Sequence, residues 1–295
     1  MSRRPQRDRP PALALVAAGA VSVQFGAAVA THLFDRVGPA GAVTLRLLIA
    51  AVLLAIPFTL RHPGRALAGK RARDVEVAVL FGLALAAMNL SFYEAIDRIP
   101  LGVAVTVEFS GPLVLALMGS RRLTDVVWAI AAGAGVALLA SGAGNHLDPV
   151  GLALAGLAGL GWIAYILLSK ETGRRFDALT GLTIAMVAGA VAVLPIGIVA
   201  GGSQLLYPEV LGLGALVAVL SSVVPYSLEL VALRQVTPRA FGVMLSLDPA
   251  VATLAGLLLL GQHLTGREWL ALSLVVGANL GNSLVGSPGV VATTP

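Results

Sequence analysis

The stretch VAVTVEFSGPLVLAL, residues 103–117, has the composition of an apolar helix, yet it carries Glu108 near its middle and Pro112 one turn later. A proline inside a helix removes one backbone hydrogen bond and frees the carbonyl of the residue four positions earlier. For Pro112 that carbonyl belongs to Glu108 itself. A carboxylate beside an opened backbone, in otherwise apolar surroundings, predicts a functional position inside a buried helix. The alternative is that the proline only bends the helix.

The whole chain shares this apolar character. Of its 295 residues, 57% are hydrophobic and 12% are charged, whereas soluble domains carry about 25% charged residues. Ten runs are apolar over the length of about 20 residues that a membrane helix needs. They are residues 11–31, 39–60, 74–96, 100–119, 124–142, 149–169, 177–200, 209–233, 239–260 and 266–286. The sequence therefore predicts an all-α membrane protein with ten transmembrane helices.

Lysines and arginines lie unevenly in the connections between these runs. Sixteen of the 20 fall in the N-terminal segment and in the connections on its side of the membrane, and three fall on the other side. Basic residues favour the cytoplasmic side, so both termini are predicted to be cytoplasmic. The formal net charge of +5 comes from these flanking residues, and it does not indicate a nucleic-acid-binding surface.

Several classes of function lack the residues that they need. The chain has no cysteine and only four histidines, so we expect neither a metal site nor a bound cofactor. The segment GNSL at 281–284 resembles the Gly-x-Ser of intramembrane serine proteases, but no histidine base lies at a matching depth. No HExxH zinc motif is present. We therefore expect a protein that is not an enzyme.

The two halves of the chain match at a nearly constant offset. Pro112 falls on Pro249 at an offset of 137 residues and Pro57 on Pro195 at 138. Two further pairs, Ala95 with Ala232 and Gly19 with Gly159, lie at 137 and 140. Chance agreement among common residues is the alternative, and the two aligned prolines argue against it.

An odd number of spans in each half would invert the second half relative to the first. We predict one five-helix repeat at 11–142 and another at 149–286, between a basic tail at 1–10 and a tail at 287–295. Inverted repeats of this kind build transporters, whose binding site lies near the midplane between the halves. Rocking of the halves would expose that site to each side in turn. A purely structural membrane protein is the alternative.

Charged residues at bilayer depth mark the predicted site. A charge in lipid costs at least ~3 kcal/mol, so it should face a cavity or a partner. Arg46 lies ~10 Å below the outer surface at 1.5 Å per residue, and Glu108 and Asp248 lie near the centres of their spans. Glu229 is nearer the cytoplasmic face, where Arg234 is an alternative partner. A structural ion pair with Arg46 is the alternative for Glu108.

One arginine and two carboxylates suit a zwitterion. Arg46 would hold an α-carboxylate, and Glu108 or Asp248 an ammonium group. Burial favours the protonated form of a carboxyl group, so Glu108, Asp248 and Glu229 are also candidates for proton coupling. Pro112 and Pro249 are the predicted helix breaks. Weaker substrate-binding candidates, with plain packing as the alternative, are Gln24, Asn89, Trp162, Tyr165 and Tyr226.

Two segments resemble a known family. They are PLGVAVTVEFSGPLVLALMGSRRLTD at 100–125 and SSVVPYSLELVALRQVTPRAFGVMLSLDPAVATLAGLLLLGQHLT at 221–265. They resemble the EamA family of the drug/metabolite transporter superfamily, and within it the threonine/homoserine exporters of bacterial inner membranes.

The resemblance implies a ten-helix inverted-repeat exporter of small amino acids in the bacterial inner (plasma) membrane, driven by proton exchange. Its matching positions are Arg46, Glu108, Pro112, Tyr226, Glu229, Asp248 and Pro249. Export of another metabolite or drug is the alternative.

Two features of the chain depart from the family's usual pattern. The segment at 261–265 lacks the family's usual glutamate, and Asp248 precedes Pro249 where relatives tend to have glutamate. The first departure leaves the outer loop without that charge, and the second keeps the charge on a shorter side chain.

The predicted partners are the amino-acid substrate, protons and membrane lipid. A second copy of the chain is a further possibility, because GANLG at 277–281 has the small-xxx-small spacing of packed membrane helices.

Overall fold

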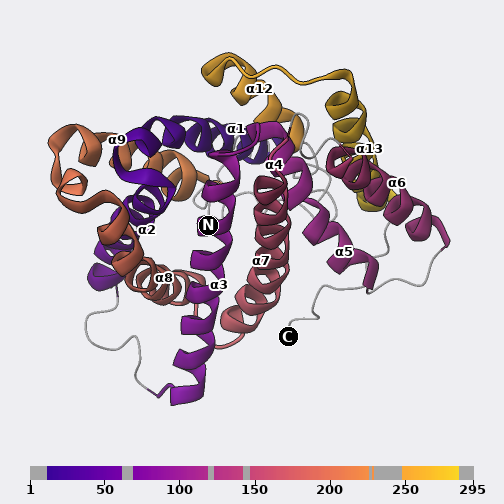
Figure 1. Cartoon of the computed structure of the whole chain (residues 1–295). Helices are drawn as coiled ribbons and strands as arrows, with labels where there is room; N and C mark the ends of the chain where they lie inside the picture. Colours follow the sequence, from indigo (N-terminus) through magenta and orange to yellow (C-terminus); the bar gives the residue numbers. More distant parts are fainter. Residues whose placement is uncertain are drawn as a thin grey trace, which may run out of the picture.

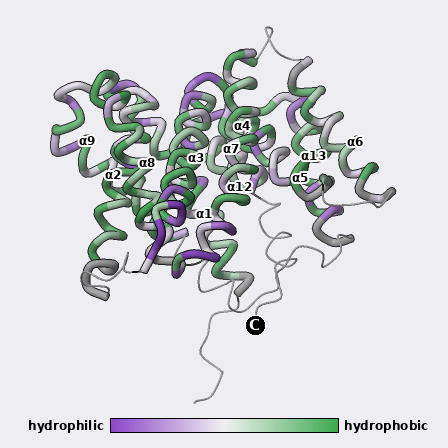
Figure 2. The backbone as a smooth tube through the Cα atoms, turned by 90° about the horizontal axis from the view of Figure 1, so that it is seen from below, coloured by the Kyte–Doolittle hydropathy of each residue, from purple (hydrophilic) through white to green (hydrophobic). Residues whose placement is uncertain are grey.

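A computed structural model describes the chain over residues 12–61, 69–118, 123–141, 147–225, 228 and 248–285. Every regular element of these residues is a helix, and the helices are apolar along most of their length (Figure 2). Four stretches are long and apolar enough to cross a membrane: Ala14–Ile56, Ala72–Ile96, Pro149–Gly173 and Thr180–Leu206. The all-helical fold predicted from the apolar runs is confirmed.

Each of the ten predicted runs contains at least one helix. In the first half these are α1 (Ala12–Ala30), the 3-10 turn η2 (Thr31–Leu33), α2 (Phe34–Arg61), α3 (Ala72–Ile96), α4 (Leu101–Glu108), α5 (Ser110–Met118) and α6 (Leu123–Ala140). In the second half they are α7 (Pro149–Gly173), α8 (Ala178–Gly201), the 3-10 turn η3 (Gly202–Leu206), α9 (Pro208–Ala218), the π-helical turn η4 (Val219–Val223), α12 (Asp248–Leu260) and α13 (Gly266–Val285).

Two elements differ from the predicted spans for local reasons. The connection expected at 32–38 is nearly all helical, and the chain reverses around η2 and Gly38, whose φ of 67° is open to glycine and strained for other residues. The span expected at 209–233 changes from an α-helix to a π turn at Val219. A π turn inserts one extra residue into a helix and is often found at functional sites.

The helices pack so that segments from the two halves lie against each other. α3 lies along α7 and α8, while α2 packs on α8. α1 contacts η4 and α12, and α4 contacts α7 and α12. α6 and α13 form a separate pair at one side of the molecule (Figure 1). The interior therefore draws on both halves of the chain.

Glycines permit the closest of these approaches. A Cβ atom built on Gly82 of α3 would overlap the carbonyl oxygen of Ala185 on α8. We expect Gly82→Val to lower the thermal unfolding midpoint of the detergent-solubilised protein, because overpacking a tight interface costs about 1–3 kcal/mol. Gly156→Val is the matched control, since a Cβ there meets no atom within 4 Å. An equal loss in both variants would contradict the prediction.

The GANLG segment packs within the chain at one of its glycines. Gly281 lies against the indole ring of Trp128 on α6, whereas a Cβ on Gly277 would have no atom within 4 Å. The tight packing of α13 is therefore on α6. The association of two copies of the chain stays a prediction.

Candidate functional site

The apolar helix of residues 103–117 is interrupted directly after Glu108. α4 ends at Glu108 and α5 begins at Ser110, with Phe109 between them. The interruption precedes Pro112, which lies within the first turn of α5. A Cβ on Gly111 would overlap the carbonyl oxygen of Gly159, so the α4–α5 junction crosses α7 backbone to backbone. This crossing holds Glu108 against α7.

The Glu108 side chain is buried and bonded to an aromatic group. It is 5% exposed, and its carboxyl group shares a hydrogen bond with Trp162 of α7. The Trp162 ring lies 5.8 Å from that of Phe109 and 5.2 Å from that of Tyr165, centroid to centroid. Trp162 and Tyr165 therefore form one aromatic surface beside the carboxyl group, as their spacing of three residues predicts.

Arg46 of α2 is 7% exposed and its guanidinium is held by neutral oxygens. Its Nε donates to Ser222 Oγ at 3.2 Å, its Nη2 to the Ser221 carbonyl at 2.8 Å and its Nη1 to Tyr93 Oη at 3.4 Å. Its Cζ also lies 5.6 Å from the Tyr93 ring centroid. Within the described ranges, no carboxylate oxygen lies within 4.0 Å of these nitrogens. Arg46 and Glu108 are therefore not paired directly.

The π turn η4 supplies two of the three groups that hold Arg46. Ser221 and Ser222 are 1% and 0% exposed. α1 presses on this turn: Ser22 Oγ donates to the Leu220 carbonyl at 2.7 Å, and a Cβ on Gly26 would overlap Ser221 Oγ. The irregular backbone is thus wedged between α1 and α2, and it aims a carbonyl at the guanidinium.

Asp248 completes a group of three buried charged residues. It begins α12 and is 4% exposed. The charges of both Arg46 and Asp248 act on the Glu108 carboxyl group. The fold therefore brings Arg46 of α2, Glu108 of α4 and Asp248 of α12 close enough for their charges to interact. A guanidinium beside two carboxyl groups can bind an anion, a cation or a proton.

The structure describes three of the remaining predicted residues, and two lie outside it. Asn89 is 3% exposed and donates to the Leu85 carbonyl of its own helix at 2.7 Å, which satisfies one of its amide hydrogens. Gln24 is buried on α1. Pro249 lies in the first turn of α12, where its carbonyl accepts from Thr253. Tyr226 and Glu229 lie outside the described residues.

Sequence reasoning missed the residues that contact Arg46. Tyr93 is fully buried near the end of α3, and Ser221 and Ser222 are the polar pair that opens SSVVPYSLE. Two adjacent serines in an apolar run carry a weak signal, because serine hydroxyls often bond to their own helix. The depth of Ser221 and Ser222 in their span, compared with that of Arg46, was the available clue.

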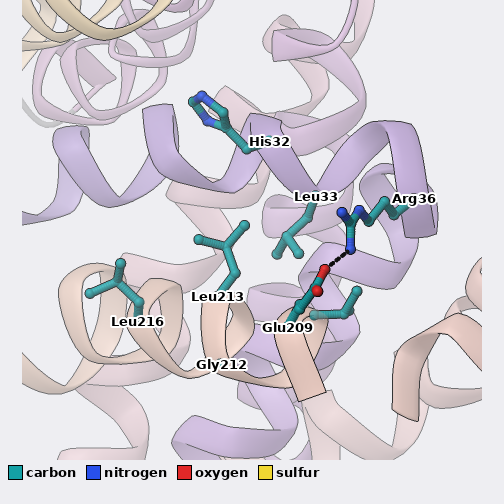
Figure 3. Close-up of a pocket in the computed structure, with 8 residues that line it drawn as sticks. His32, Leu33, Arg36, Glu209, Gly212, Leu213 and Leu216 are labelled. Carbon is teal, nitrogen blue, oxygen red and sulfur yellow. Dashed lines mark hydrogen bonds and ion pairs between the residues drawn. The ribbon is translucent and has the colours of Figure 1, made fainter. Parts of the chain in front are cut away.

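A pocket of about 430 Å³ lies elsewhere, between the η2 turn and α9. Arg36 and Glu209 meet at its edge, and Leu213 and Leu216 form part of its apolar wall (Figure 3). None of the residues that line it belongs to the Arg46–Glu108–Asp248 group.

Known proteins resemble this chain over most of its length. Residues 149–284 match the EamA-like transporter family. The chain is 40% identical over 269 residues to the threonine/homoserine exporter RhtA of Salmonella typhimurium (strain LT2), which covers 89% of this chain and 88% of the relative. It is 39% identical over the same length to RhtA of Escherichia coli (strain K12), with the same shares covered.

A more distant relative and a solved structure extend the comparison. The uncharacterized inner membrane transporter YedA of Escherichia coli (strain K12) is 29% identical over 236 residues, covering 73% of this chain and 74% of the relative. A crystal structure with 20% identity shares the fold, with a TM-score of 0.60 over 95% of this chain and 100% of the other.

A relative at 40% identity spans most of the chain, and the family matches nearly all of the second half. The protein is therefore a membrane transporter rather than an enzyme, and the chain belongs to the EamA-like transporter family.

Proposed function

We propose that the chain exports small amino acids of the threonine and homoserine type across the bacterial inner membrane, by alternating access and in exchange for protons. The observation that carries this proposal is the buried group of Arg46, Glu108 and Asp248 in a chain 40% identical to a threonine/homoserine exporter. In this proposal the three charged side chains bind the substrate, which explains why residues with a high cost of burial in a membrane are found there.

In this proposal Arg46 binds the α-carboxylate of the substrate. Its three donor contacts go to uncharged oxygens, so the guanidinium is positioned but keeps a positive charge that an anion would neutralise. Arginine also presents paired N–H groups in a plane, which match the two oxygens of a carboxylate. Glu108 and Asp248 are then placed to bind the ammonium group or a proton. The aromatic surface of Trp162 and Tyr165 would border the substrate side chain.

The packing of the helices supports an inverted repeat. If α1–α6 and α7–α13 are two repeats, α2 on α8 pairs second helix with second, and α6 on α13 pairs fifth with fifth. The contact of α3 with α7 has its counterpart in that of η4 with α1, and the contact of α4 with α7 in that of α12 with α1. The same neighbours recur when the halves are exchanged, as a twofold relation requires.

Contacts between turns support the proposed crossings of the membrane. Arg36 with Glu209, Arg98 with Asp148, and the Leu101 amide with Gln262 all join connections on the predicted outer side. Arg175 with Asp74 joins two connections on the predicted cytoplasmic side. No described ion pair or side-chain hydrogen bond joins the two sets of turns. This pattern supports the proposed alternation of the turns between the two sides of the membrane. The excess of lysine and arginine on the side of Arg175 and Asp74 then assigns that side, with both termini, to the cytoplasm.

Transport in proteoliposomes tests the proposal. Vesicles would be loaded with radiolabelled threonine, homoserine, valine or a larger amino acid, and a pH gradient imposed. Valine has the shape of threonine without its hydroxyl group, so it tests whether that group is recognised. We expect threonine and homoserine to leave faster than from protein-free liposomes and faster with the gradient than without it. If no amino acid leaves faster than from protein-free liposomes, export of amino acids is ruled out.

A further inference from the structure

Two of the described ion pairs join the halves of the chain on opposite sides of the molecule. Arg36 Nη1 lies 2.6 Å from Glu209 Oε2, which links the start of α2 to the start of α9 (Figure 3). Arg175 Nε lies 3.1 Å from Asp74 Oδ1, which links the turn after α7 to the start of α3. Each pair spans from one half of the sequence to the other.

The two pairs are equivalent under the sequence repeat. Arg175 follows Arg36 by 139 residues, within the range of 137 to 140 at which other positions of the halves match. Glu209 follows Asp74 by 135 residues, and each is an acidic residue in the first turn of its helix. In both pairs the arginine lies next to the turn between a repeat's first and second helices. The acid begins the third helix of the other repeat. The same contact is thus built twice, once on each side.

We propose that these pairs are two matched latches, one closing each side of the transporter, which break in alternation as the binding site opens to that side. The inference rests on the alternating access proposed above. A carrier with two inverted repeats reaches its second state by exchanging the conformations of its halves. A contact that closes one side must then have an equivalent on the other. Both latches are formed in this structure, with Arg46, Glu108 and Asp248 buried between them.

The two latches differ in strength. The side chains of Arg36 and Glu209 are 51% and 77% exposed, whereas those of Arg175 and Asp74 are 22% and 24% exposed. Arg175 also bonds to Glu171, and its own carbonyl accepts a hydrogen bond from Lys70. Exposed ion pairs are weak, while ordered networks are stronger. The inner latch is therefore the stronger one and biases the resting protein toward a closed cytoplasmic side.

Spin-label distances in lipid nanodiscs test this inference without any substrate. The chain has no cysteine, so two introduced cysteines can be labelled alone. Asp35→Cys with Gly212→Cys reports on the outer side, and Glu76→Cys with Gly173→Cys reports on the inner side. Asp35 and Glu76 are exposed, and a Cβ on Gly212 or Gly173 has no atom within 4 Å.

Removing either latch should shift the two distances in opposite directions. Arg36→Gln is expected to raise the fraction of molecules with separated outer labels up to about fivefold, and to lower the fraction with separated inner labels. Arg175→Gln should do the reverse, by about five- to tenfold because its network is better ordered. The double exchange Arg36→Glu with Glu209→Arg should restore the wild-type distances.

The controls remove an arginine from the same sides without touching a latch. Arg267→Gln removes a charge on the outer side and Arg73→Gln removes one on the inner side; both residues are exposed and neither has a described ion pair. Three results would contradict the latches: both variants shifting the distances in one direction, a control shifting them as much as its latch variant, or no shift in either variant. Failure of the amino-acid flux assay would leave these distances interpretable, because they do not depend on the cargo.

Discussion

Arg46→Gln is expected to reduce the export of threonine at least about thirtyfold and to leave a folded protein. The guanidinium is held by Ser222, Tyr93 and the Ser221 carbonyl, and in the proposed function it alone neutralises the substrate carboxylate. Losing one partner of a buried charge pair costs about 2–5 kcal/mol. Glutamine removes the charge without burying another, so folding should be less affected than transport. Size-exclusion profiles and thermal unfolding would check the fold, and efflux from proteoliposomes the rate.

A substrate analogue separates a binding role of Arg46 from a structural one. Threoninamide keeps the side chain and ammonium group of threonine but lacks the carboxylate charge. Wild-type protein should export threonine much faster than threoninamide, and Arg46→Gln should lose that preference. Arg46→Lys should also be strongly impaired, because one ammonium nitrogen cannot reach the three separated oxygens that the planar guanidinium contacts. A glutamine variant that still preferred threonine over its amide would show that Arg46 does not bind the carboxylate.

Tyr93→Phe provides a graded comparison for these two variants. It removes one acceptor of Arg46 and keeps the ring beneath the guanidinium. A hydrogen bond from a charged group contributes about 1.5–3 kcal/mol, and this one is long, at 3.4 Å, so its loss should cost about the low end of that range, or roughly tenfold. Its effect on transport should therefore fall below that of Arg46→Gln, which removes the charge itself.

The helices of this fold could be predicted because long apolar runs in a membrane have few alternatives to a helix. The predicted run 266–286 corresponds to Gly266–Val285, and 74–96 to Ala72–Ile96. The break at Phe109 lies where Pro112 acts, because that proline frees the carbonyl of Glu108, and α7 presses its glycine backbone on α4 and α5 at the same place. The π turn at Val219–Val223 was not predicted.

The site could be predicted from the sequence only where a residue is costly at its depth. Arg46, Glu108 and Asp248 stand out because each is a charge in an apolar run, and the structure places all three together. Tyrosine and serine are common in membrane helices, so Tyr93, Ser221 and Ser222 do not stand out in the sequence. The π turn at Val219–Val223 places the two serines against Arg46. A π turn leaves no clear mark in composition, so the partners of Arg46 required the fold.

Glu108→Gln is expected to abolish export driven by a pH gradient while leaving exchange of threonine across the membrane. Glutamine has nearly the same shape as glutamate and can still accept a hydrogen bond from Trp162. It cannot bind and release a proton. In the proposed cycle the site takes a proton from the outer side and releases it to the cytoplasm before substrate binds. A variant that cannot carry the proton should still move substrate down its own gradient.

The control for this variant is another buried carboxylate that lies outside the charged group. Glu268 is 5% exposed and accepts a hydrogen bond from the Thr265 amide at the start of α13. Glu268→Gln should retain the pH dependence of the wild-type protein, even if it lowers stability. Asp248→Asn tests whether the second carboxyl group shares the proton, in which case it should weaken the coupling of proton to substrate rather than only the rate. Glu108→Gln protein that still drives threonine uphill on a pH gradient would assign proton coupling to another residue, because its side chain at this position has no titratable proton.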